Sequence, residues 1–126
     1  MLPPGEYDVT SSRGPEYKVE RQKLTVQAEE TSTLSIKLKR WVTPNAFGFY
    51  GGDHHIHAAG CSHYTLPTEG VTPEDMFRQV KGEGLNVGCV LTWGPCYDHQ
   101  RQFFAPIAHD ISERDTLLKY DLEISG

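Results

Sequence analysis

The sequence lacks the features that define several common protein classes. Its 126 residues contain no apolar run near the roughly 20 residues that a membrane-spanning helix requires. The formal net charge is −5, which argues against a nucleic-acid-binding surface. The nearest approach to a basic patch is Lys37, Lys39 and Arg40, and we interpret it as the solvated face of a strand. The three cysteines are an odd number and too few for the disulfide framework of a small secreted domain.

The first residues also lack a secretory signal. Residues 1–5 carry no charged stretch and no long apolar core, and they resemble the turn before a strand. We therefore expect the chain to begin inside a domain. Cys89 and Cys96 can close one loop in an oxidising compartment, but free thiols are the expected state.

Residues 1–43 alternate apolar and polar side chains, which predicts β-strands with one buried face. The alternation is most regular at Leu34, Ile36 and Leu38. Shorter alternating pairs precede it: Tyr7 with Val9, Tyr17 with Val19, and Leu24 with Val26. These strands are too few for a complete sandwich, so we expect part of an all-β module, Ig-like or transthyretin-like.

A histidine-rich segment follows an aromatic run at residues 47–50, and together they predict a buried strand that ends in an open loop. Strand side chains alternate between faces, so Asp53, His55 and His57 are expected on one face and His54 on the other. We interpret His55 and His57 as metal ligands, with Asp53 supporting them from outside. The alternative is a pair of core histidines bonded to the backbone.

The segment after the histidines predicts a strand–helix–strand unit and hence a parallel sheet. A long loop at residues 58–71 precedes Thr72 and Pro73, which are typical of a helix start. Met76, Phe77 and Val80 form the expected buried stripe of this helix.

Two more strands are predicted beyond that helix. Residues 85–92 are largely apolar and suit a strand covered on both faces, and residues 117–124 alternate as a third strand. A short helix is expected between them, within residues 97–104. Three parallel strands do not close a barrel, so we expect a fragment of a longer protein.

These motifs resemble the start of a PHP (polymerase and histidinol phosphatase) domain of the CehA/McbA type. The matching elements are the D-x-H-x-H of Asp53, His55 and His57, then Glu69-Gly70, Pro73-Glu74-Asp75, Glu83-Gly84-Leu85-Asn86-Val87 and Asp121-Leu122-Glu123-Ile124-Ser125. The resemblance implies an α/β fold for residues 44–126, the first three strands of a β/α barrel, after the β module of residues 1–43. It also implies that Glu123 is a metal ligand.

One motif departs from the family pattern. Where PHP domains have T-D-H at the end of the second strand, this sequence has Thr92-Trp93-Gly94. Asp98 and His99 follow shortly afterwards, and we expect them to line the pocket. The catalytic acid or base is expected to be one of these two or a residue outside this sequence. His63 is a further pocket candidate. The resemblance implies zinc, manganese or iron, as one to three ions, with the remaining ligands beyond residue 126.

The expected activity is that of a metal-dependent hydrolase. A metal-activated water would cleave an ester, amide or phosphoester in a small-molecule substrate. Residues 1–126 alone are expected to show little or no turnover. The resemblance also implies export to the periplasm or cell exterior. The alternatives are a catalytically degenerate PHP scaffold and a secreted β-module binding protein.

Overall fold

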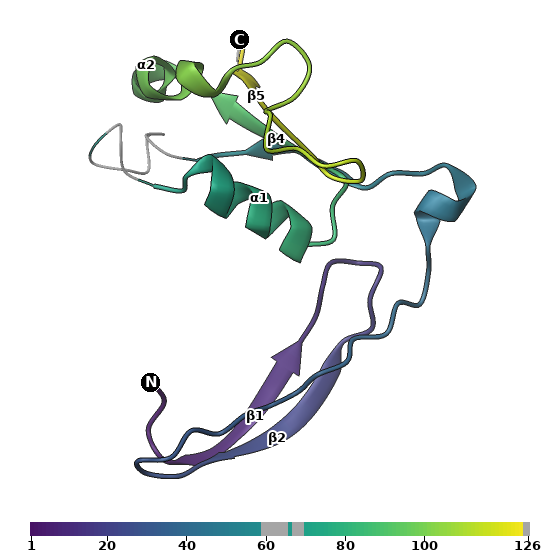
Figure 1. The fold of residues 1–126 in the computed structure, drawn as a ribbon, viewed down its shortest axis with the longest axis vertical. Helices are drawn as coiled ribbons and strands as arrows, with labels where there is room; N and C mark the ends of the chain where they lie inside the picture. The colour runs from purple at the N-terminus through teal and green to yellow at the C-terminus, as the bar shows by residue number, and fades with distance from the viewer. Residues whose placement is uncertain (59–65, 67–69, 125–126) are drawn as a thin grey trace. The chain divides into compact units, whose positions relative to one another are not determined.

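The computed structural model describes residues 1–58, 66 and 70–124 (Figure 1). It divides into two compact units, residues 1–43 and residues 44–126. Within the described ranges, no helix is long and apolar enough to cross a membrane. The pocket candidate His63 lies outside the described residues, as does most of the loop that precedes the first α-helix.

The first unit contains one two-stranded antiparallel sheet. Strands β1 (Gly5–Ser11) and β2 (Glu20–Val26) pair in a continuous register. An isolated bridge between Tyr17 and Arg40 joins the returning chain to the β1–β2 connection. The guanidinium of Arg40 donates to the Tyr17 hydroxyl at 2.7 Å and also forms an ion pair with Glu16. This unit is therefore a β-hairpin, and the chain that follows it is held to the β1–β2 connection by the contacts of Arg40.

The prediction of a strand over Leu34, Ile36 and Leu38 was wrong, and with it the expectation of β-structure throughout this unit. Residues 31–39 form no strand. All three side chains are nevertheless half-buried while their neighbours are exposed. The alternation thus correctly indicated that one side of this segment is half-buried and the other exposed. A strand, however, also needs a hydrogen-bonded neighbour. The unit gives this segment no ladder.

The second unit begins with a short helix rather than the expected buried aromatic strand. A 3-10 helix, η1 (Pro44–Phe47), is followed by Gly48, which adopts a positive φ of 80°. Phe47, Phe49 and Tyr50 are 69–76% exposed. The predicted buried strand was therefore wrong at this end, because the turn directs the chain away from the sheet. Strand β3 (Gly52–Ile56) starts only after it.

The strand–helix–strand prediction is confirmed. Helix α1 (Pro73–Gly82) connects β3 to β4 (Val87–Thr92), and β5 (Leu117–Leu122) follows later in the chain. The strands form one parallel sheet in the order β3-β4-β5, and α1 packs on one of its faces (Figure 1). Closure into a barrel is not seen in the described part of the chain.

Local signals define α1 as expected. The hydroxyl of Thr72 accepts a hydrogen bond from the Asp75 backbone N–H at 3.3 Å, and Pro73 occupies the first turn. The predicted stripe is buried and forms the core with residues of β4 and β5 and with Ala58, which follows β3. The core residues are Ala58, Met76, Phe77, Val80, Val90, Leu118 and Tyr120. In β4 the residues on one face are buried and those on the other face are half-buried. The expected coverage of both faces is therefore complete on one face only.

The chain beyond β4 folds into three short helical segments, η2 (Gly94–Cys96), α2 (Tyr97–Gln100) and η3 (Arg101–Phe103). The short helix predicted within residues 97–104 is therefore confirmed. Cys96 is fully buried, and its thiol donates to the Trp93 carbonyl at 2.8 Å. Cys89 and Cys96 are free thiols, as expected.

Candidate metal centre

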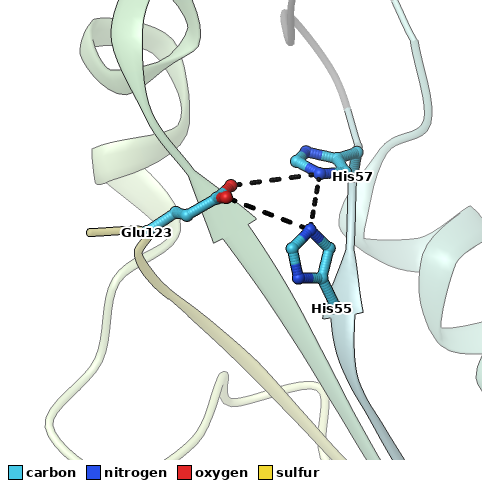
Figure 2. Close-up of side chains that lie close together, drawn as sticks. All are labelled: His55, His57 and Glu123. Atoms are coloured by element: carbon cyan, nitrogen blue, oxygen red, sulfur yellow. Dashed lines mark hydrogen bonds and ion pairs between the residues drawn. The ribbon is translucent and has the colours of Figure 1, made fainter. Parts of the chain in front are cut away.

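Three predicted ligands meet at the carboxyl edge of the parallel sheet. His55 is the next-to-last residue of β3, His57 directly follows that strand, and Glu123 directly follows β5. Because parallel strands all end at the same edge, residues far apart in sequence converge there. Figure 2 shows the Glu123 carboxylate reaching past the end of β4 toward both imidazoles.

The ligand atoms lie close to the spacing of a metal site. The Nε2 atoms of His55 and His57 are 3.1 Å apart. Glu123 Oε1 lies 4.0 Å from His55 Nε2, and Glu123 Oε2 lies 3.9 Å from His57 Nε2. Two ligands of a tetrahedral ion with bonds of about 2.1 Å are about 3.4 Å apart. The residues therefore fit one divalent ion with modest closure of the carboxylate.

The burial of Glu123 supports this interpretation. Its side chain is 18% exposed, and its buried Oε2 atom has no hydrogen-bond partner among the described residues. The 3.9 Å to His57 Nε2 is too long for a hydrogen bond. A buried carboxylate oxygen without a partner is costly, and a cation between the three groups would satisfy it. His55 is 53% exposed, so core packing does not explain its position.

A β-bulge in β3 shapes the histidine pair. Asp53 pairs with Gly88 and Ile56 pairs with Val90, so three steps along β3 match two along β4. The strict alternation that was expected to place Asp53 on the face of His55 does not hold across this bulge. Asp53 Oδ1 instead accepts the backbone N–H of His55 at 2.9 Å. Its support reaches the histidine through the backbone, not through the imidazole.

Two buried residues next to the site, Thr92 and Gln100, were not selected from the sequence. The Glu123 backbone N–H donates to the Thr92 carbonyl at 2.9 Å. The Thr92 hydroxyl donates to Gln100 Oε1 at 2.8 Å, and both side chains are fully buried. This tie depends on how α2 packs, so only tertiary structure reveals it.

Asp98 and His99 are not part of the three-residue ligand group. The Asp98 side chain is 85% exposed, and its Oδ1 lies 3.9 Å from an Arg101 guanidinium nitrogen. The His99 ring stacks edge-on against Phe103, and its Nδ1 lies 3.2 Å from Gln102 Nε2. The catalytic role of Asp98 and His99 remains a prediction.

The pKa of the Cys89 thiol, in β4, is shifted mainly by burial, and charges of both signs act on it. Burial raises the pKa of Cys89, and the carboxylate of Asp53 raises it further. The pKa of Asp121 is lowered by the Leu122 backbone N–H and by Lys119, whose ammonium lies 3.2 Å from Asp121 Oδ2. A thiol with a raised pKa stays protonated at neutral pH, which disfavours Cys89 as a metal thiolate.

The candidate centre thus consists of two imidazole nitrogens and one carboxylate, gathered from two strands of a parallel sheet. The ligand geometry of this chain carries the functional inference. Comparisons with protein families, with curated proteins and with solved structures find no match to the chain.

Proposed function

We propose that His55, His57 and Glu123 hold a divalent metal ion and that the protein is a metal-dependent hydrolase of the PHP type. The observation that supports it most is the buried Glu123 Oε2 atom, which has no hydrogen-bond partner among the described residues and lies 3.9 Å from His57 Nε2. The Nε2 atom of His57 is in turn 3.1 Å from that of His55. Three such groups converging at the carboxyl edge of a parallel sheet suit an active site.

The donor set favours some metals over others. Two imidazoles and a carboxylate suit zinc, iron or manganese, whereas magnesium and calcium prefer oxygen ligands alone. When bound, such an ion acts as a Lewis acid that polarises the substrate and lowers the pKa of a coordinated water. The proposed substrates are small esters, amides or phosphoesters.

The protein's own groups then have distinct tasks. The imidazoles of His55 and His57 bind in their neutral form, and the Glu123 carboxylate offsets part of the positive charge of the ion. The partial exposure of His55 leaves the site accessible to a small molecule. Asp98 and His99, which follow the carboxyl end of β4, are the proposed groups for proton transfer.

Metal content tests this proposal directly. The tag-free 126-residue chain is purified beside a His55→Ala/His57→Ala double variant, and both are titrated with zinc, manganese, iron(II) and magnesium. We expect near-stoichiometric binding of a transition metal by the wild type and its loss in the double variant. Equal metal uptake by both proteins, or none by either, would sink the proposed centre.

A second function is a metal-binding scaffold without catalysis. It is favoured by Trp93 and Gly94, which stand where the resemblance implies an aspartate and a histidine. Trp93 is 40% exposed and Gly94 offers no side chain. Metal-dependent hydrolysis of p-nitrophenyl esters or of bis-p-nitrophenyl phosphate by the metal-loaded protein would exclude the scaffold.

A further inference from the structure

We propose that the hydrogen bond between Thr92 and Gln100 positions Glu123 for metal binding. The proposal rests on the metal centre proposed above and assigns it two positioning residues. Neither side chain is part of the ligand group. Both act through the backbone carbonyl of Thr92, which holds the Glu123 N–H.

First, the backbone of Glu123 is anchored to β4. Glu123 lies one residue beyond the end of β5, and the next residue, Ile124, is 93% exposed. The bond from the Glu123 N–H to the Thr92 carbonyl, at 2.9 Å, is the terminal bond of the parallel ladder and joins the last residue of β4 to the residue after β5. The place of the Glu123 backbone therefore depends on where β4 ends.

The second step is the fixing of that strand end. Thr92 is the last residue of β4, and the chain turns immediately afterwards at Gly94, whose φ is 57°. The Thr92 hydroxyl donates to Gln100 Oε1, eight residues further on, at 2.8 Å. Both residues are fully buried, where a hydrogen bond is stronger and its loss more costly than at the surface. The bond ties the strand end to α2.

The third step links this tie to ligand geometry. Metal ligands must lie within about 0.2 Å of their ideal distances, so a small shift of a strand end is felt in affinity. Groups outside the ligand set that orient a ligand typically change metal affinity 10–100-fold when mutated. Loosening Thr92 should therefore weaken metal binding even though its side chain touches no ligand atom.

A purely structural role for Thr92 makes a different prediction, and two substitutions separate the roles. Thr92→Val removes the hydroxyl but keeps the shape and the preference for strands. Thr92→Ser keeps the hydroxyl but loses a buried methyl group, at a cost of stability. If Thr92 only stabilises the fold, metal affinity follows stability. If it positions Glu123, metal affinity follows the hydroxyl.

Cobalt(II) is the probe, because its visible absorption reports ligand geometry as well as binding. We expect Thr92→Val to weaken cobalt binding about tenfold and to alter the spectrum. Thr92→Ser should bind as the wild type does. Thr116→Val is the matched control, since Thr116 is also buried but precedes β5 at the opposite edge of the sheet. It should leave affinity and spectrum unchanged.

A double-mutant cycle with Glu123→Gln completes the test. If Thr92 acts through Glu123, Thr92→Val should have little further effect once the carboxylate is gone. Unchanged cobalt affinity in Thr92→Val, or equal losses in Thr92→Val and Thr116→Val, overturns the positioning role while the metal centre stands. Absence of cobalt binding by the wild type overturns both proposals.

Discussion

The Nε2 atoms of His55 and His57 lie 3.1 Å apart, although the ring centroids are 5.0 Å apart and the rings are inclined by 66°. The two rings therefore approach each other through the nitrogens that bind metals. An N–H···N hydrogen bond accounts for this distance when one of the Nε2 atoms carries the proton, and a cation accounts for it when both present lone pairs. The Glu123 carboxylate adds a third possible donor atom to this pair, as a metal site requires.

Metal-linked stability should depend on His57 and not on its neighbour His54. A ligand present at 100 times its Kd stabilises the folded state by about 2.7 kcal/mol. We expect zinc to raise the free energy of unfolding of the wild type and of His54→Ala by this order, and to leave His57→Ala unchanged. Urea unfolding with and without zinc measures it. Equal zinc effects in the two variants would contradict the site.

Asp53 should support the site by accepting a hydrogen bond from the His55 backbone, and not through its negative charge. Its Oδ1 accepts the His55 N–H within the β-bulge. Asp53→Asn keeps an oxygen acceptor and removes the charge, whereas Asp53→Ala removes both. We expect metal affinity to survive Asp53→Asn and to fall about tenfold in Asp53→Ala, as for other groups that orient ligands. Calorimetric titration with zinc tests this, and equal losses in both variants would point to the charge instead.

The parts of the fold that sequence predicts are those with local causes. The start of α1 follows from Thr72 and Pro73, whose side chains act on the first turn itself. The parallel sheet follows from the order of strand, helix and strand. The meeting of His55 and His57 with Glu123 was implied by the family resemblance, and the structure brings these residues together.

The parts that sequence missed depend on distant partners. Leu34, Ile36 and Leu38 alternate as a strand does, yet no neighbouring backbone pairs with them. The bulge beside Asp53 arises from the register between β3 and β4, which no single segment encodes. The bond between Thr92 and Gln100 likewise requires α2 to fold back over the end of β4. In each case tertiary contacts decide what local pattern leaves open.

A side chain at Gly88 should clash with Val80 and cost stability. A Cβ at Gly88 would lie 2.5 Å from Val80 Cγ2, and the branched valine side chain has little freedom to move away. We expect Gly88→Ala to lower the free energy of unfolding by about 1–3 kcal/mol through overpacking. In Gly88→Ala/Val80→Ala the new methyl group fills part of the space that Val80 leaves. The double variant should therefore lose less stability than the sum of the single variants, and strict additivity in urea unfolding would contradict this contact.

Tyr120 should destabilise the protein at alkaline pH through its buried hydroxyl. The side chain is 1% exposed, and its hydroxyl has no hydrogen-bond partner among the described residues. Burial raises the pKa of this phenol, and the negative charge of Glu74 adds to the effect. Because removing an unsatisfied buried hydroxyl relieves a desolvation penalty, we expect Tyr120→Phe to stabilise the fold by about 1 kcal/mol at pH 7.

The pH dependence of that difference tests the cause. The folded protein keeps the phenol protonated to higher pH than the unfolded chain does, where ionisation occurs near pH 10. The effect of this group on the free energy of unfolding is therefore constant below about pH 10. The free energy of unfolding then falls as pH rises further, since the unfolded state releases its proton first. We expect the advantage of Tyr120→Phe over the wild type to be constant from pH 7 to 9 and to widen by pH 11. Urea unfolding across this range measures it, and a gap that does not change with pH would show that the hydroxyl is hydrated or bonded in the folded state.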